Sequence, residues 1–326
     1  MSQQLAIVIP YYKLDFFRDA LLSLKKQTNQ RFTIYIGDDA SPYDPLPVLE
    51  ELNTNNWVTN KIVYQKFAQN LGKNSLVKQW ERCVALTQNE NWIWLFSDDD
   101  VMEKACVANF YSALAETNGQ YDLYKFNTSV INAKNNIIFA LKNPPAGELD
   151  NFSLINQKIS SQIYSLVVEY IFSRQTYEKT GGFVDFPLAW GSDDATWVKF
   201  SGTTGIYIIK GANVLWRISG INISGNRWEN RQLKLKALLL YCKWMLYYFK
   251  NHKELAVLKA NLLNYCLRET ENYASVITPT LFLKIYLTFF NTADFSFKKL
   301  LLFAYQKNIS SVKWKLAQMH LIRSGS

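Results

Sequence analysis

The feature that most constrains the fold is an alternation of short apolar stretches with amphipathic stretches through the first hundred residues. The apolar stretches are typical of buried strands and occupy residues 5–9, 32–36, 62–64 and 92–96. Residues 14–27 and 74–88, which lie between them, carry apolar side chains at helical spacing. Alternating strands and helices predict an α/β fold, with a mostly parallel sheet flanked by helices.

Acidic residues recur where predicted elements meet. Asp38-Asp39 follows the second strand, Asp98-Asp99-Asp100 follows the strand at 92–96, and Asp193-Asp194 opens a predicted helix that runs through Phe200. Parallel sheets bind ligands outside the carboxyl ends of their strands. We therefore expect the first two acidic turns to open on the same edge of the sheet.

The run Asp98-Asp99-Asp100 has two interpretations. Adjacent carboxylates repel one another and raise each other's pKa values, and a divalent cation with a preference for oxygen ligands would relieve that conflict. Asp is also a turn former and a helix N-cap, so an acidic strand-to-helix turn needs no metal. The other acidic turns favour a metal site, and a metal at a strand end indicates phosphate chemistry.

Histidine and cysteine usage excludes several kinds of active site. The only histidines, His252 and His320, lie far along the chain from the acidic turns, which argues against a Ser-His-Asp or Cys-His site and against histidine-ligated zinc. The four cysteines are widely spaced and form no CxxC pair, as in a reduced cytosolic protein. We find no signal-peptide pattern and no spanning apolar run, and we expect a cytoplasmic protein.

Charge divides the chain into two parts. Residues 231–326 hold 15 Lys and Arg against 4 Asp and Glu, whereas residues 1–230 hold 21 against 23. From about residue 231 long helical stretches rich in Leu, Tyr, Phe, Trp and Lys dominate, and Lys236, Lys243 and Lys250 recur every seven residues on one helix face.

Several motifs, in this order and spacing, resemble the inverting family 2 glycosyltransferases of the bacterial surface-glycan type, which have the GT-A fold. The resemblance covers about residues 5–224. It rests on Ile7-Val8-Ile9-Pro10-Tyr11-Tyr12, Ser23, Gln27-Thr28, Gly37-Asp38-Asp39-Ala40-Ser41, Asn70-Leu71-Gly72, Ser97-Asp98-Asp99-Asp100, Ile171-Phe172-Ser173-Arg174, Gly181-Gly182-Phe183 and Asp193-Asp194.

The resemblance implies a catalytic domain over 1–225 and a basic, aromatic-rich helical region over 226–326. It also implies a nucleotide-sugar site and a Mn²⁺ or Mg²⁺ site. The nucleotide-sugar site would comprise Pro10, Tyr12, Asp38, Asp39, Asn70, Lys73, Asp98 and Arg217. The metal ligands would be Asp99 and Asp100, with Asp99 favoured, although the register also allows Asp98 and Asp100 to form the DxD pair.

Asp194 resembles the residue that takes the proton from the acceptor hydroxyl in an inverting transfer. Asp193 replaces the usual Glu, so the two carboxylates are able to exchange roles. Arg217 resembles an Arg near the diphosphate, but Ser219 stands where the family often has His, which leaves a surface or salt-bridge role open. Arg227-Trp228 lacks the preceding Gln of processive synthases, which favours transfer of a single sugar.

The expected activity is inverting, metal-dependent transfer of one sugar from a nucleotide-diphosphate sugar, with UDP as the favoured carrier. The expected acceptor is a glycan or a polyprenyl-diphosphate-linked glycan of surface polysaccharide synthesis. A sugar-phosphate nucleotidyltransferase would need a Gly-rich, basic phosphate loop after the first strand, where this chain has Pro10-Tyr11-Tyr12-Lys13. Departures at Ser97, Asp193 and Ser219 keep open a catalytically idle homologue that binds sugar nucleotide or scaffolds an assembly complex.

The basic tail has three interpretations. Its helices pack as a bundle with solvated lysines, or its lysines and aromatic residues attach the protein peripherally to the inner face of an anionic membrane. Nucleic-acid binding is disfavoured, because no nucleic-acid motif accompanies the charge.

Overall fold

The computed structural model describes residues 4–218, 230–290 and 297–324, with side chains described as far as residue 311. The chain forms two compact units, one of Met1–Asp185 with Ser192–Asn222 and the other of Phe186–Gly191 with Ile223–Ser326. The boundary that the sequence predicts, between residues 225 and 226, lies outside the described residues. Each unit is described in turn.

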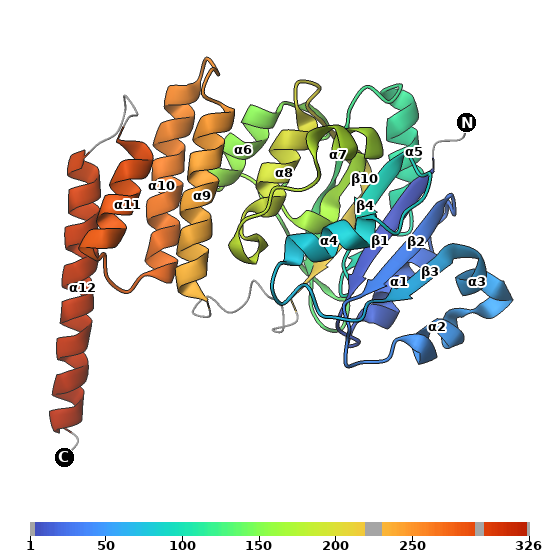
Figure 1. Ribbon diagram of the computed structural model, residues 1–326, viewed down its shortest axis with the longest axis horizontal. Helices are drawn as coiled ribbons and strands as arrows, with labels where there is room; N and C mark the ends of the chain where they lie inside the picture. Colours follow the sequence, from blue (N-terminus) through green and yellow to red (C-terminus); the bar gives the residue numbers. More distant parts are fainter. Residues whose placement is uncertain (1–3, 219–229, 291–296, 325–326) are drawn as a thin grey trace. The chain divides into compact units, whose positions relative to one another are not determined.

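The first unit is built on a single sheet of ten strands, which Figure 1 shows with helices around it. Four neighbouring strands pair in parallel, in the order β3 (Ile62–Lys66), β2 (Phe32–Asp38), β1 (Leu5–Tyr11) and β4 (Trp92–Leu95). The order continues through β9 (Tyr170–Ser173), β6 (Leu123–Ile131), β10 (Ile206–Arg217) and β5 (Val101–Met102). Two short strands pair outside this path, β7 (Ile137–Ala140) with β6 and β8 (Gly147–Leu149) with β10.

The four predicted strands are present, and the α/β fold class is confirmed, although the second half of the sheet is mixed. β9 runs antiparallel to both β4 and β6, whereas β6 and β10 pair in parallel. One strand end was predicted wrongly: β1 does not end with the apolar stretch 5–9 but continues through Pro10 to Tyr11. At Pro10 the strand pairs with β2 only, since its pairing with β4 covers residues 5–8. Proline is tolerated where a strand has a free side, because its missing N–H then costs no ladder bond.

Helices cover both faces of the sheet, and β1 is therefore buried on both of its faces. Leu5, Ile7 and Ile9 pack into the main core together with apolar residues of α1 (Phe17–Lys25) and α5 (Cys106–Glu116), whereas α4 (Leu76–Val84) packs against β1 and β2. The remaining helices of this unit are α2 (Leu46–Leu52), α3 (Trp57–Lys61), α6 (Asn151–Ile159), α7 (Arg174–Thr180) and α8 (Ser192–Ser201).

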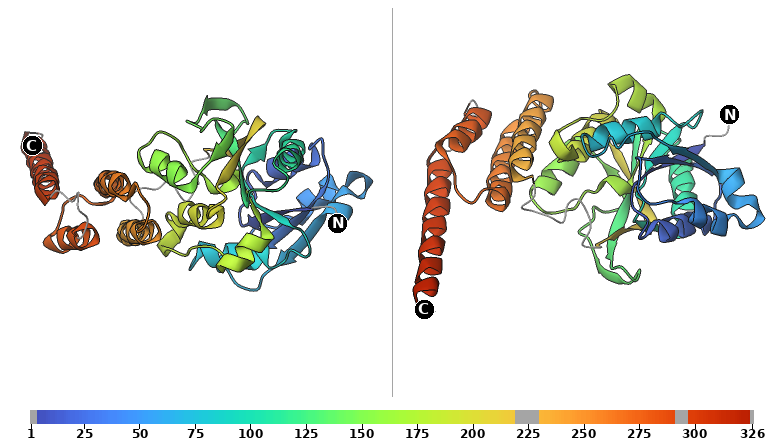
Figure 2. Two further views of the ribbon diagram at one scale, coloured as in Figure 1. Left: turned by 90° about the horizontal axis from the view of Figure 1, so that it is seen from above. Right: turned by 60° about the horizontal axis from the view of Figure 1, so that its bottom comes forward.

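The second unit is helical, as the sequence predicts. Its helices are α9 (Arg231–Tyr248), α10 (Leu255–Tyr273), α11 (Pro279–Phe289) and α12 (Phe297–Ser324). Both α10 and α11 pack on α9, and both views of Figure 2 show α9 and α10 side by side. No helix in the described parts of the chain is long and apolar enough to cross a membrane.

A short segment of the chain joins the helical unit immediately before α8. It contains the 3-10 helix η3 (Pro187–Ala189), which packs against α9. The Trp190 ring lies in edge contact with Tyr273 of α10 at a centroid distance of 5.9 Å. Gly191 has a left-handed φ of +78°, and a Cβ there would come within 2.8 Å of the Tyr241 ring. The residue after Gly191 is Ser192, the first residue of α8, which carries Asp193 and Asp194.

Candidate active site

The end of β1 bridges the first two acidic turns. The backbone N–H of Tyr12 donates to Asp98 Oδ2 at 2.8 Å, and its carbonyl accepts from Ser41 Oγ at 2.7 Å. Because β1 lies between β2 and β4, the turns that follow those two strands flank its carboxyl end. The Tyr12 side chain is 40% exposed, and Pro10 pairs with Gly37 one step before the β2 turn. The structure thus brings Pro10 and Tyr12 to the expected edge of the sheet.

Asp38 stabilises the β2 turn. Its carboxylate is fully buried, accepts from the Ser41 N–H at 2.7 Å and from the Tyr64 hydroxyl at 2.6 Å, and lies 3.8 Å from Lys66 Nζ. Burial raises the pKa of Tyr64 above its ordinary value, and so do its hydrogen bond to Asp38 and the negative charge of that carboxylate. Both oxygens of Asp38 are therefore occupied by groups of the protein itself.

Asp39 holds the loop that contains Asn70-Leu71-Gly72, which we call the N-x-G loop. Its two oxygens accept from the backbone N–H groups of Leu71 and Gly72 at 2.6 and 2.9 Å, and its carboxylate is ion-paired with Arg82 of α4. Gly72 is required for this approach, because a Cβ at that position would lie 2.6 Å from Asp39 Oδ2. The carboxylate thus fixes the position of the loop at the carboxyl edge of β2.

The N-x-G loop has its own closing bond. Asn70 Oδ1 accepts from the Lys73 N–H at 2.8 Å, and the Lys73 side chain is exposed. The Arg82 guanidinium also donates to the Gln69 carbonyl at 3.0 Å and lies 4.0 Å from the centre of the Phe67 ring. Arg82 therefore ties the loop both to Asp39 and to α4.

The three aspartates after β4 differ in their partners. Asp98 accepts from the N–H groups of Tyr12 and Lys13 at 2.8 and 2.9 Å, and Asp100, which is 3% exposed, accepts from the Arg217 N–H at 2.8 Å. The carboxylate of Asp99 is hydrogen-bonded to the Ser97 hydroxyl. Among the described contacts, Asp99 is thus the aspartate of this run that no backbone N–H engages.

Burial and mutual repulsion disfavour the charged forms of this run. Burial and the adjacent Asp99 raise the pKa of Asp98 to about 6, and the same two causes raise the pKa of Asp100 well above its ordinary value. Such a crowded set of carboxylates suits a divalent cation, which accepts oxygen ligands and neutralises their charge. Within the described residues, however, no three His, Cys, Asp or Glu side chains converge as a complete metal cage.

Arg217 is buried behind the acidic turn. Its guanidinium donates to the carbonyls of Asp99 and Asn132 at 2.6 and 2.9 Å and to Asn135 Oδ1 at 2.6 Å, and it lies 3.6 Å from the Asp19 carboxylate. Burial lowers the pKa of the guanidinium, and the neighbouring carboxylates oppose that shift. In this arrangement Arg217 fixes the backbone of the turn formed by Asp98, Asp99 and Asp100. A contact with the diphosphate, the role that the sequence resemblance implies, would require these bonds to be exchanged. Ser219 and the pair Arg227-Trp228 lie outside the described residues.

The third acidic pair lies in the first turn of α8 and is faced by a lysine from α6. Asp194 is 4% exposed and forms an ion pair with Lys158. Burial and the neighbouring Asp194 raise the pKa of Asp193 to about 7, while Lys158 acts in the opposite direction. Asp193 is the more exposed of the two carboxylates. The pair thus combines one carboxylate that is ion-paired with a lysine and a second whose pKa lies near neutral, which suits proton transfer.

The family model described as glycosyl transferase family 2 matches residues 6–175, which is more than half of the chain and includes the turns after β2 and β4. This chain is a family 2 glycosyltransferase. Its membership confirms the family that the sequence motifs indicate, and with it the class of enzyme. No curated protein sequence matches the chain significantly.

Solved glycosyltransferase structures share the fold of this family 2 enzyme. S. aureus TarS 1–349 in complex with UDP-GlcNAc has a TM-score of 0.61 at 13% identity, and the match covers 95% of this chain and 89% of that one. GalNAc-T7 with UDP, GalNAc and Mn²⁺ has a TM-score of 0.55 at 12% identity, with coverage of 92% and 56%. At these identities the likeness concerns the fold alone.

Two residues that contact the candidate site residues were not found from the sequence. Arg82 reaches Asp39 across 43 positions, and Lys158 reaches Asp194 across 36. Each lies on an amphipathic helix where a basic residue is ordinary, so no local signal distinguishes it. The opposite-charge partner becomes visible only when the helices are placed on the sheet.

Proposed function

We propose that this glycosyltransferase transfers a single sugar, with inversion, from a nucleotide-diphosphate sugar to a hydroxyl of a glycan or lipid-linked glycan. The observation that carries the proposal is the pair of acidic turns flanking the end of β1, tied together through Tyr12. UDP is the nucleotide that we propose first, because the two relatives of similar fold are solved with UDP-GlcNAc and with UDP.

In this proposal the nucleoside lies over the β2 turn and the Asn70–Lys73 loop. Asp39 positions the loop, and the exposed Tyr12 ring offers a surface on which a base is able to stack. Lys73, whose side chain is exposed, lies on the loop beside this surface and is available to a phosphate. Asp98 accepts hydrogen bonds from the backbone N–H groups of Tyr12 and Lys13 and so holds the segment that carries the Tyr12 ring.

We propose Asp99 as the first ligand of a divalent cation, with Asp100 beside it, because Asp98 is held by two backbone N–H groups. A bound Mn²⁺ or Mg²⁺ supplies Lewis-acid stabilisation of the charge that develops on the leaving diphosphate. Arg217 keeps the turn in place through the Asp99 carbonyl and the Asp100 carboxylate.

The acceptor hydroxyl attacks the anomeric carbon from the side opposite the diphosphate, in this mechanism. The bond from that carbon to the acceptor oxygen forms, the bond to the phosphate oxygen breaks, and the hydroxyl proton passes to the pair Asp193-Asp194. We place the proton on the pair because adjacent carboxylates titrate together. Lys158 is ion-paired with Asp194 and opposes the rise in the pKa of Asp193.

Calorimetry with UDP, in the presence and absence of Mn²⁺, tests the donor site, and UDP release from UDP-GlcNAc and other UDP-sugars tests turnover. We expect UDP to bind, more tightly with Mn²⁺, and at least one UDP-sugar to be turned over. Asp194→Asn is expected to lower turnover about 10²- to 10⁴-fold, which is the usual contribution of a general base. Asp193→Asn is the comparison that divides the role between the two carboxylates. If the chain bound no nucleoside diphosphate under either condition, the donor assignment would be wrong.

The acceptor and the location of the enzyme form the last part of the proposal. The basic helical unit, with 15 Lys and Arg against 4 Asp and Glu in residues 231–326, suits an anionic lipid surface. We propose that the enzyme works at the inner face of the cytoplasmic membrane on surface-polysaccharide precursors. Sedimentation with anionic vesicles, compared with neutral ones, tests this location.

A further inference from the structure

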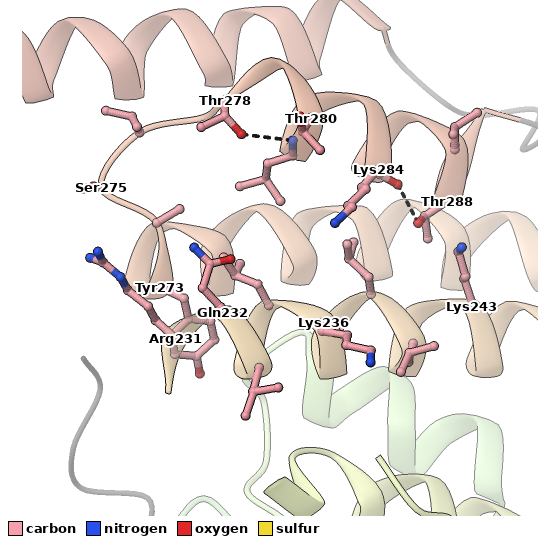
Figure 3. A pocket seen from close by; sticks show the side chains of 18 residues that line it. Arg231, Gln232, Lys236, Lys243, Tyr273, Ser275, Thr278, Thr280, Lys284 and Thr288 are labelled. Carbon is pink, nitrogen blue, oxygen red and sulfur yellow. Dashed lines mark hydrogen bonds between the residues drawn. The ribbon is translucent and has the colours of Figure 1, made fainter. Parts of the chain in front are cut away.

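A groove in the helical unit has a composition that no catalytic role explains. It lies between α9 and α11 and has a volume of about 730 Å³, within the usual range for small-molecule sites. Figure 3 shows the side chains that line it, which come from α9, from the end of α10 and the segment after it, and from α11.

The floor of the groove is apolar and open. Leu235 and Leu239 of α9 and Leu281 of α11 line it, and Leu240 and Leu287 add side chains that are 38% and 52% exposed. Single exposed leucines scattered over a surface are common. Exposed leucines gathered in one concave site instead indicate a binding site for an apolar group.

The rim of the groove is positively charged. Arg231, Lys236 and Lys243 contribute from α9 and Lys284 from α11, and no Asp or Glu is among the described residues that line the groove. Figure 3 shows Lys243 projecting from α9 toward α11, and Lys284 projecting from α11 into the space between the two helices. Along α9, Arg231 and Lys243 are separated by about 18 Å at 1.5 Å per residue.

An apolar floor with a cationic rim matches one class of ligand, an amphiphilic anion. We infer that this groove binds one molecule of a phosphate-bearing lipid, with its hydrocarbon chain along the leucines and its phosphate among Lys236, Lys243 and Lys284. Two of the lysines that recur every seven residues along the sequence line this site. The third, Lys250, does not line it and instead lies 4.4 Å from the centre of the Tyr247 ring.

This inference rests on the proposed function, in which the acceptor is linked to a lipid. A groove for a lipid phosphate would bind the lipid phosphate of such an acceptor. The binding itself is measured without any glycosyl transfer. Failure of the groove and failure of the donor site are therefore separate results.

The test is calorimetry of the full chain with decyl phosphate below its micelle concentration. Octyl phosphate, decyl maltoside and inorganic pyrophosphate are the comparison ligands. We expect affinity to rise by up to about fourfold for each CH₂ added between the octyl and decyl chains, in line with the transfer free energy of a methylene group. We expect decyl maltoside and inorganic pyrophosphate to bind far more weakly, because each lacks one of the two features that the groove recognises.

Matched variants locate the binding. Lys243→Gln and Lys284→Gln are each expected to weaken decyl phosphate binding roughly fivefold, whereas Lys250→Gln leaves it unchanged. Leu287→Asn is expected to weaken it, and Leu283→Asn, at an equally exposed position of α11 that does not line the groove, is its control. All of these positions are exposed, so the folded state tolerates the changes.

Three results would overturn the inference. Affinity independent of chain length would mean that a polar anion or an acidic protein segment, not a lipid, occupies the groove. Equal losses in Lys243→Gln and Lys250→Gln would mean general charge attraction. Binding to phosphatidylglycerol vesicles without binding to monomeric decyl phosphate would mean attachment to a bilayer surface. UDP binding by the wild-type chain, measured in parallel, reports on the donor site alone.

Discussion

Replacing Lys158 by Met is expected to shift the pH dependence of glycosyl transfer to higher pH. Burial and Asp194 raise the pKa of Asp193 to about 7, and the ammonium of Lys158 limits that rise. Without the ammonium, Asp193 is expected to hold its proton more tightly. A general base works only in its deprotonated form, so activity is present above the pKa of the pair and is lost as the pH falls through it.

The expected size of the shift in the pH midpoint follows from how far the Lys158–Asp194 ion pair is buried. Two unit charges about 4 Å apart attract by about 4 kcal/mol at an effective dielectric constant of about 20, which corresponds to about three pKa units. Because 19% of the Lys158 side chain is exposed, solvent screens part of this attraction, and we expect a shift of about one unit. At pH 7 the deprotonated fraction then falls from about one half to about one tenth, a roughly fivefold loss of rate that is regained near pH 9.

The assay is UDP release from a UDP-sugar substrate, measured as kcat/KM between pH 5.5 and 9.5. Lys158→Arg keeps the charge and is expected to keep the midpoint. Lys199→Met is the control for destabilisation, because this lysine lies on α8, the helix that carries Asp193 and Asp194, but donates to the carbonyls of Thr180 and Gly182. A Lys158→Met enzyme that lost rate equally at every pH, with its midpoint unmoved, would show that Lys158 only supports the fold.

Three further variants test other parts of the structure. Asp99→Asn is expected to abolish the Mn²⁺ enhancement of UDP binding, which calorimetry with and without chelator measures; an unchanged enhancement would remove Asp99 from the metal site. Gly72→Ala places a Cβ 2.6 Å from Asp39 Oδ2, and we expect on the order of tenfold weaker UDP binding, or about 1.4 kcal/mol; unchanged affinity would separate the loop from the donor site. Lys125 and Glu169 are fully buried and lie 3.1 Å apart, so Lys125→Met alone is expected to cost about 3–5 kcal/mol in chemical denaturation. Adding Glu169→Gln should recover part of that loss, and no recovery would mean that packing, not charge, dominates there.

The elements and the acidic turns were predictable from the sequence because they depend on local features. A buried parallel strand is a short apolar run, and the turn that follows it lies within a few residues, so the sequence alone assigns Asp39 and Asp98 to an edge of the sheet. Pro10 shows the limit of such rules. Whether a proline ends a strand depends on which side of the strand is paired, and that is a property of the whole sheet.

The roles of single side chains within those turns were less predictable. Asp38 and Asp39 are adjacent in sequence, yet one is satisfied by Ser41 and Tyr64 and the other by the loop at Leu71 and Gly72. Arg217 was expected at the diphosphate, but its guanidinium is bonded to the backbone of the acidic turn and to Asn135. Apart from Ser41, which lies three residues after Asp38, the partners of Asp38 and Asp39 come from segments more than 20 positions away.

The family, the order of strands and helices, and the acidic turns after β2 and β4 are readable from the amino-acid sequence, because they are encoded in runs of neighbouring residues. Which of these carboxylates already have partners becomes visible only in the folded chain. It pairs Asp39 with Arg82 and Asp194 with Lys158, and it turns evenly spaced lysines of α9 into one rim of a groove that α11 completes. The physical reason is that charge and burial act through space, and the residues that meet there are dozens of positions apart along the chain.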